Sequence, residues 1–228
     1  MSKVTRMNAE SNNIQDYLKK SEVINYDHKL IVNKCLELKK EMEGMEKREG
    51  MEKMGGTEEK DEISLIRRIY EFVRDDIDHS GDIGAQEVTC KASEVLEIGH
   101  GICCAKSHLL AAMLRYFGIP TGFCYQKLCS GQEGLNRKVL HGLNAVYLKD
   151  LNKWVRLDAR GNKPGVDAQF SIHEEKIAWQ ANKERGEEDH PVIFKEPNPV
   201  VVEVLKKSNT RKEMWAQWDL GLKDVFRD

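Results

Sequence analysis

The sequence has no long apolar segment. Its first thirty residues contain no hydrophobic stretch of the kind found in secretory signal peptides, and no window approaches the roughly 18 apolar residues of a membrane-spanning helix. A chain of 228 residues can also bury a sizeable core without disulfides, so its six cysteines do not imply a disulfide framework. We therefore expect a soluble, cytoplasmic protein with no membrane partner.

An excess of charge of one sign is missing too. The 36 lysines and arginines nearly balance the 38 aspartates and glutamates. Proteins that bind nucleic acid usually carry a basic patch, so this balance gives no reason to expect a nucleic-acid partner. Paired Cys-x-x-Cys motifs and EF-hand loops are also absent, and we expect no cofactor.

Helical periodicity dominates the first half of the chain. Apolar residues predict one or two helices between residues 14 and 38 and an amphipathic helix over 63–77. Between them, residues 41–62 repeat Gly-Met-Glu-Lys and are dense in charge, which favours a mobile linker or a frayed helix end. A short helix over 93–97 precedes a central helix over about 103–117, which ends at a glycine and a proline.

Strand-forming residues dominate the chain after this central helix. Helices followed by antiparallel strands are typical of an α+β fold. The predicted strands cover residues 122–128, 141–148 and 154–158, with a further one over 200–205.

Cys103 lies in the first turn of the predicted central helix. The unpaired N–H groups and the positive end of the helix dipole at such a position favour a thiolate. The adjacent Cys104 points about 100° away around a helix, so it is predicted to pack in the core. This places one nucleophilic thiol, Cys103, at the start of the helix.

A nucleophile needs a base, and the base needs a group that orients it. If Leu148 pairs with Lys153 across the predicted hairpin, Asp158 lies diagonally opposite His141 on the same face of the sheet. A slip of one residue would separate them. The sequence thus predicts a triad of Cys103, His141 and Asp158.

These residues carry a resemblance to a known family. The order Gly101-Ile102-Cys103, a helix leading to residues 115–120, His141 before a strand, and then Trp154 to Asp158 resembles the transglutaminase-like superfamily of papain-type cysteine enzymes. The resemblance implies that Cys103 is the acyl-accepting thiolate, His141 the general base and acid, and Asp158 the residue that holds the imidazole tautomer.

The resemblance also implies an architecture. It predicts a papain-like core in which the nucleophile helix packs on an antiparallel sheet. We divide the chain into an N-terminal helical extension and charged linker (1–60), a transglutaminase-like catalytic domain (61–210) and a C-terminal tail (211–228).

This chain departs from the family pattern at two positions. Many members have an aromatic residue directly after the cysteine or two places after the histidine, where this chain has Cys104 and Leu143. Both departures bear on substrate choice. For the oxyanion, the Cys103 N–H is one donor, and Gln126 is considered as another.

Other residues have competing interpretations. His79, His100 and His108 are alternative bases, of which His79 can also line the cleft wall. Lys106 and Arg115 are placed on a solvated helix face, and Trp154 in the core. Residues 167–179 and 184–189 look like surface segments, and residues 161–228 contain no motif that we interpret.

The leading hypothesis is a cysteine-dependent enzyme that acts on amide bonds through a thioester. Its partner is a protein, peptide or small amide substrate, with water or an amine as acceptor. One alternative is an inactive, partner-binding protein on the same fold. The other is a zinc-binding protein, with ligands drawn from Cys104, His108, Cys124 and Cys129.

Overall fold

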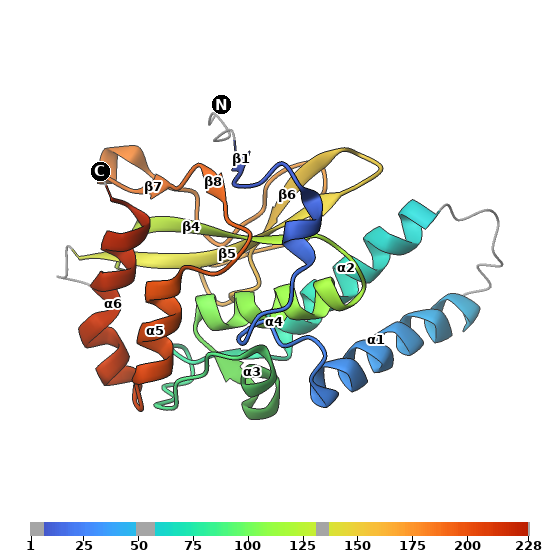
Figure 1. Ribbon diagram of the computed structural model, residues 1–228, viewed down its shortest axis with the longest axis horizontal. Helices are drawn as coiled ribbons and strands as arrows, with labels where there is room; N and C mark the ends of the chain where they lie inside the picture. Colours follow the sequence, from blue (N-terminus) through green and yellow to red (C-terminus); the bar gives the residue numbers. More distant parts are fainter. Residues whose placement is uncertain (1–6, 49–57, 131–136, 228) are drawn as a thin grey trace.

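The computed structural model describes residues 7–48, 58–130 and 137–227. A four-stranded antiparallel sheet with strand order β6-β5-β4-β7 lies against helix α4, and other helices surround α4 on its remaining sides (Figure 1). This arrangement confirms the α+β fold predicted from the sequence. None of the described helices is long and apolar enough to cross a membrane.

Helices occupy the predicted helical segments up to residue 117, and two more follow between residues 199 and 225, where the sequence predicted none. The α-helices are α1 (Lys29–Arg48), α2 (Glu58–Asp75), α3 (Ala92–Ile98), α4 (Cys103–Tyr116), α5 (Pro199–Lys207) and α6 (Arg211–Val225), with 3-10 turns at Ile14–Leu18 and Lys183–Arg185.

The strands divide between one main sheet and two short parallel pairs. The main sheet contains β4 (Thr121–Cys129), β5 (Lys138–Leu148), β6 (Lys153–Leu157) and β7 (Glu188–Asp189), and the pairs are β1 (Asn8–Ala9) with β8 (Val192–Ile193) and β2 (Asp78–His79) with β3 (His100–Gly101).

The β5–β6 hairpin has the register expected from its loop. Leu148 pairs with Lys153, and Asn144 pairs with Leu157. In the loop, Asn152 has a φ of 46°, a left-handed conformation that asparagine tolerates better than most residues. Because the loop fixes the register, residues of β5 and the end of β6 face one another as the sequence predicts.

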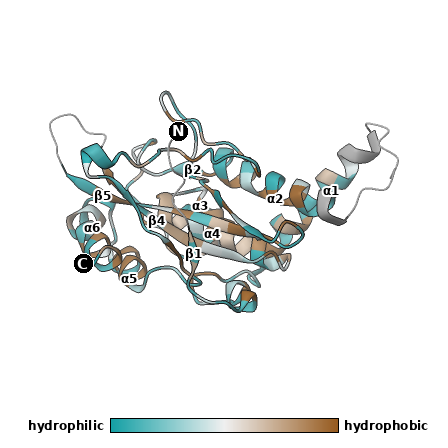
Figure 2. Cartoon of the chain, turned by 90° about the horizontal axis from the view of Figure 1, so that it is seen from above, coloured by the Kyte–Doolittle hydropathy of each residue, from teal (hydrophilic) through white to brown (hydrophobic). Residues whose placement is uncertain are grey.

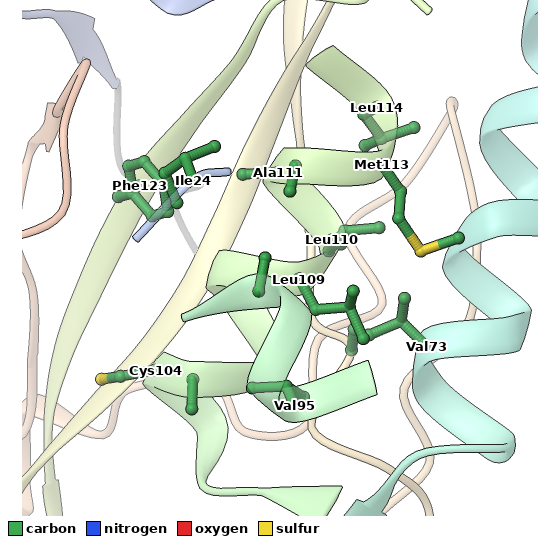
Figure 3. Close-up of a cluster of buried hydrophobic side chains, with 14 of the residues drawn as sticks. Ile24, Val73, Val95, Cys104, Leu109, Leu110, Ala111, Met113, Leu114 and Phe123 are labelled. Atoms are coloured by element: carbon green, nitrogen blue, oxygen red, sulfur yellow. The ribbon is translucent and has the colours of Figure 1, made fainter. Parts of the chain in front are cut away.

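Helix α4 is buried on all sides. Every residue from Cys103 to Arg115 is buried, and Figure 2 shows the helix as a largely apolar element beside the sheet. Figure 3 shows side chains of α4 between Val73 of α2, Val95 of α3 and Phe123 of β4. This packing holds the start of α4 in a fixed place relative to the sheet.

The burial of α4 corrects one prediction, because Lys106 and Arg115 are buried rather than solvated. Lys106 donates to the carbonyl oxygens of Arg74, Ile77 and Arg160. Arg115 donates to the carbonyl oxygens of Thr121, Lys19 and Lys195 in the same manner. Carbonyls at the ends of neighbouring elements satisfy these cations in place of water.

Residues 200–205 form part of helix α5, so the predicted strand there is wrong. Asn198 caps the helix through its side chain, which accepts from the N–H groups of Val200 and Val201, and Pro199 occupies the first turn. The β-branched run favours a strand locally, but the cap starts a helix whose buried residues are Val201, Val204 and Leu205.

Residues at both ends of the chain pack into the same core as α4. Ile31 and Leu38 of α1 belong to this cluster, as do Met214 and Trp218 of α6. The Trp218 indole also donates to the carbonyl oxygen of Leu140 on β5.

Candidate active site

Cys103 is the first residue of α4 and directly follows the short strand β3. Only 9 % of Cys103 is exposed, so the residue is largely buried. The N–H groups of a first helical turn have no partner inside the helix, and they face the thiol. The sequence predicted this start of the helix correctly.

His141 on β5 and Asp158, directly after β6, lie in contact. The Nε2 atom of His141 is 2.8 Å from Oδ2 of Asp158, and both side chains are almost fully buried. Asp158 also accepts from the backbone N–H groups of Ala178 at 3.0 Å and Arg160 at 3.2 Å. Burial alone would raise the pKa of Asp158, but the charge and hydrogen bond of His141 lower it.

Cys103 and His141 also interact, since each shifts the pKa of the other through charge and hydrogen bonding. Because Nε2 is bonded to Asp158, Nδ1 is the ring nitrogen left for the sulfur. Burial alone would lower the pKa of His141, but the negative charges of Asp158 and Cys103 raise it to about 10. The structure thus brings Cys103, His141 and Asp158 together in the predicted order.

Cys104 lies against β5, as its predicted packing role requires. A Cβ atom at Gly142 would lie 2.5 Å from the Cys104 sulfur, so only glycine fits at that position without movement. Its interaction with Cys103, together with burial, raises the pKa of Cys104 well above its ordinary value, so Cys104 is the protonated partner of the two.

Two effects oppose each other at the Cys103 thiol. The hydrogen bond from Cys104 lowers its pKa, burial raises it, and the charge and hydrogen bond of His141 lower it further, as does a hydrogen bond from His79. The balance holds the pKa of Cys103 well below its ordinary value. With His141 protonated, the favoured state at neutral pH is a thiolate beside an imidazolium.

Of the three alternative bases, only His79 contacts Cys103. His79 ends β2, and the parallel pairing of His79 with Gly101 places it two residues from Cys103 in register. His100 instead bonds Ser80 at 3.0 Å, and His108 bonds the carbonyl oxygen of Cys90 at 2.7 Å.

Trp179 is a site residue that the sequence did not reveal. It stands edge-on to His141, and the guanidinium of Arg160 lies over its ring at 5.3 Å. The interpretation of 167–179 as a surface segment is therefore wrong for its last residues, because Ala178 also donates to Asp158. No periodic pattern in the sequence marks these positions. They reach His141 and Asp158 only when the chain folds back onto the sheet.

Gln126 is buried beneath this loop. Its Nε2 atom donates to the carbonyl oxygen of Trp179 at 3.1 Å and to Asp189 at 2.8 Å. Both partners can only accept, which fixes the orientation of the amide and commits both of its N–H groups. Gln126 therefore holds the Trp179 loop and is not a donor for an oxyanion.

The four residues considered as zinc ligands do not converge. Cys104 packs against β5 and His108 against Cys90, while Cys124 belongs to a second apolar cluster and Cys129 contacts Lys138. Within the described ranges, no group of three or more metal-ligating side chains is close enough to hold a metal ion.

One family of known proteins matches part of this chain. Residues 52–159 match the model of the transglutaminase-like superfamily, and this segment includes Cys103, His141 and Asp158. The family predicted from the sequence is therefore confirmed, and residues 52–159 belong to the transglutaminase-like superfamily. No curated protein matches the chain.

Two solved structures resemble the chain distantly. A candidate cysteine protease from Cytophaga hutchinsonii is 19 % identical with a TM-score of 0.39, over 66 % of this chain and 43 % of that protein. A candidate protease from Parabacteroides distasonis is 16 % identical with a TM-score of 0.33, over 60 % of this chain and 26 % of that protein. The chain thus spans less than half the length of either protein.

Proposed function

We propose that this protein is a cysteine-dependent acyl-transfer enzyme that acts on amide bonds through a thioester intermediate. The observation that carries this proposal is the contact of Cys103 with His141, whose far ring nitrogen is bonded to Asp158 at 2.8 Å. A nucleophile, a base and a residue that orients the base are the parts that such chemistry needs.

In the first step, the Cys103 thiolate attacks the carbonyl carbon of the amide. A C–S bond forms, and the π electrons of the carbonyl move onto its oxygen. When the oxyanion collapses, the C–N bond breaks, and the His141 imidazolium gives its proton to the leaving amine. The product is a thioester on Cys103 and a neutral imidazole at His141.

In the second step, His141 takes a proton from the acceptor. The acceptor, water or a primary amine, attacks the thioester carbon, and the C–S bond breaks to regenerate the thiolate. Asp158 stays ionised throughout, because it orients Nε2–H and stabilises the imidazolium without itself becoming protonated.

The substrate class that we propose is a protein, peptide or small amide, and the proposed setting is the cytoplasm. All six cysteines are free, which is expected where thiols are kept reduced.

Thiol alkylation with chloroacetamide across pH tests the nucleophile. Because the pKa of Cys103 is lowered, we expect one fast phase that persists well below pH ~8, the ordinary range of a cysteine. Cys103→Ala should abolish this phase, and His141→Ala should move it to higher pH. Cys129→Ala, which removes a partly exposed thiol, is the matched control. A fast phase that survives Cys103→Ala would contradict the proposal.

Acylation with 4-nitrophenyl acetate tests the chemistry. We expect mass spectrometry to find one acetyl group on Cys103 of the wild type and none on Cys103→Ala. Adding a primary amine separates the two acceptors: if the amine is acetylated faster than water hydrolyses the thioester, the enzyme is an amine acyltransferase, and otherwise it is a hydrolase. A wild type that alkylates rapidly but is never acylated would refute acyl transfer.

A further inference from the structure

A second histidine lies beside Cys103. This is His79 at the end of β2, whereas His141 is on β5. His79 pairs with Gly101, two residues before Cys103, and interacts with the thiol. Its side chain is 14 % exposed, compared with 4 % for His141. The mechanism above uses only one imidazole. It also needs a side chain that donates a hydrogen bond to the oxyanion. Gln126 does not fill this role, because its N–H groups donate to Trp179 and Asp189.

The hydrogen bonds of His79 determine its tautomer. The backbone N–H of Gly81 donates to Nδ1 of His79 at 3.2 Å, so Nδ1 carries a lone pair. In a neutral imidazole the proton then lies on Nε2. The nitrogen that remains for Cys103 is therefore a donor, and it has no lone pair with which to take the thiol proton.

The surroundings of His79 keep its ring neutral. Its nearest carboxylate, Asp82, is 4.0 Å from Nδ1, too far for a hydrogen bond. Asp82 is instead paired with both Nη atoms of Arg160, at 2.5 and 2.8 Å, and with Lys163 at 2.7 Å. Burial lowers the pKa of His79, with the hydrogen bond and charge of Cys103 acting the other way.

We propose that His79 is a further catalytic residue, a neutral imidazole whose Nε2–H donates first to the Cys103 thiolate and then to the oxyanion. The inference rests on the acyl-transfer function proposed above. As the C–S bond forms, negative charge moves from the sulfur to a carbonyl oxygen only two bonds away. The donor follows that charge without transferring a proton, and it acts together with the Cys103 N–H at the start of α4.

The absence of a side chain at Gly81 leaves room for the His79 ring. A Cβ atom at Gly81 would lie 3.1 Å from Cε1 and 3.2 Å from Nδ1 of His79, closer than most real contacts. With alanine at this position, the His79 ring would have to move by a few tenths of an ångström. Gly81→Ala therefore shifts the imidazole while retaining the histidine.

Comparing acylation with alkylation tests the donor. Acylation by 4-nitrophenyl acetate forms an oxyanion, whereas alkylation by chloroacetamide displaces chloride at a saturated carbon and forms none. The variants are His79→Leu, which removes the donor, and His79→Gln, whose amide N–H replaces Nε2–H. Each is measured at a pH where its own alkylation profile shows the thiolate to be fully formed, and His28→Leu, at an exposed position, is the control.

We expect His79→Leu to slow acylation by roughly 10²- to 10³-fold, the loss typical of a missing oxyanion donor, with alkylation within a few-fold of wild type. His79→Gln should recover at least about tenfold of the lost rate, and the shape of its pH profile should match the wild type because His79 does not exchange a proton. Gly81→Ala should show the same selective loss, and it carries the test if His79→Leu does not fold by circular dichroism.

Three results would overturn the inference. Equal losses in acylation and alkylation would mean that His79 acts on the sulfur alone. Unchanged acylation in His79→Leu, with a wild type that is acylated, would exclude the donor and leave the proposed function standing. A wild type that is alkylated at Cys103 but never acylated would refute both.

Discussion

Trp179 stands edge-on to His141, with ring centroids 5.2 Å apart and ring planes at 85°. The indole packs against the ring that connects Cys103 with Asp158, and the His141 side chain is only 4 % exposed. A less hydrated ion pair is a stronger one, since the effective dielectric constant around it is lower.

We predict that Trp179→Ala weakens this ion pair. The loss of an aromatic contact worth about 1 kcal/mol should slow acylation by roughly fivefold, and water at the exposed pair should move the pKa of His141 down from about 10. The alkaline limb of amide turnover should then move to lower pH. Trp154→Ala, which removes a ring packed against Tyr17, is the control and should leave that limb in place.

The contact between Gly142 and Cys104 leads to a second prediction. In Gly142→Ala the new Cβ would lie 2.5 Å from the Cys104 sulfur, so either β5 or the start of α4 must shift. We expect a loss of roughly 1–3 kcal/mol in the free energy of unfolding and slower acylation, because His141 is the adjacent residue. Denaturant unfolding measures the first effect.

A double-mutant cycle identifies the cause. Cys104→Ala removes the sulfur that the new Cβ meets, so Gly142→Ala should cost less in that background, with a coupling of about 0.5–3 kcal/mol. Gly44→Ala on α1 is a matched control, because nothing lies within 4 Å of a Cβ there. Additive effects of the two substitutions would contradict the steric explanation.

Lys106 is the subject of a third prediction. Lys106→Met keeps the apolar stem but removes the donors to the carbonyl oxygens of Arg74, Ile77 and Arg160. Burial lowers the pKa of Lys106 to about 7, so the substitution removes a donor that is only partly charged at neutral pH. We expect the free energy of unfolding to fall by roughly 1–3 kcal/mol, because buried carbonyl oxygens lose their donor. Thermal or urea unfolding measures the loss, and exposed Lys39→Met serves as the control. A loss equal to that of the control would show that water replaces the ammonium group.

The buried His108 predicts how stability varies with acid. Burial lowers its pKa to about 4, below the roughly 6.5 of an unfolded chain. Between these two values the unfolded state binds more protons, so stability rises with pH from about 4 to 6.5, by roughly 3 kcal/mol from this group. His108→Asn, an uncharged donor to the Cys90 carbonyl, should flatten this part of the profile, and His28→Asn should not.

Local signals in the sequence were enough to predict the start of α4 and the hairpin register. A glycine-flanked cysteine before an apolar helical stripe marked Cys103, and the four-residue loop fixed which residues of β5 and β6 pair. The first feature placed the thiol. The second brought His141 and Asp158 together, because the register decides which side chains share a face of a sheet.

Features that depend on distant contacts could not be predicted in this way. The Trp179 loop reaches the site without periodicity, and His79 does so through a two-residue parallel pairing that no local pattern indicates. Lys106 and Arg115 have charged side chains, so composition placed them in water, whereas the surrounding backbone carbonyls allow them to be buried. At 200–205, a run of valines favoured a strand, but the cap at Asn198 starts a helix.

The complete enclosure of α4 limits how this protein can evolve. A helix in which every residue from Cys103 to Arg115 is covered tolerates little change in side-chain volume. Substitutions in the segments around it, such as residues 76–90 and 159–190, can therefore reshape the surroundings of Cys103 while the packing that supports it stays in place.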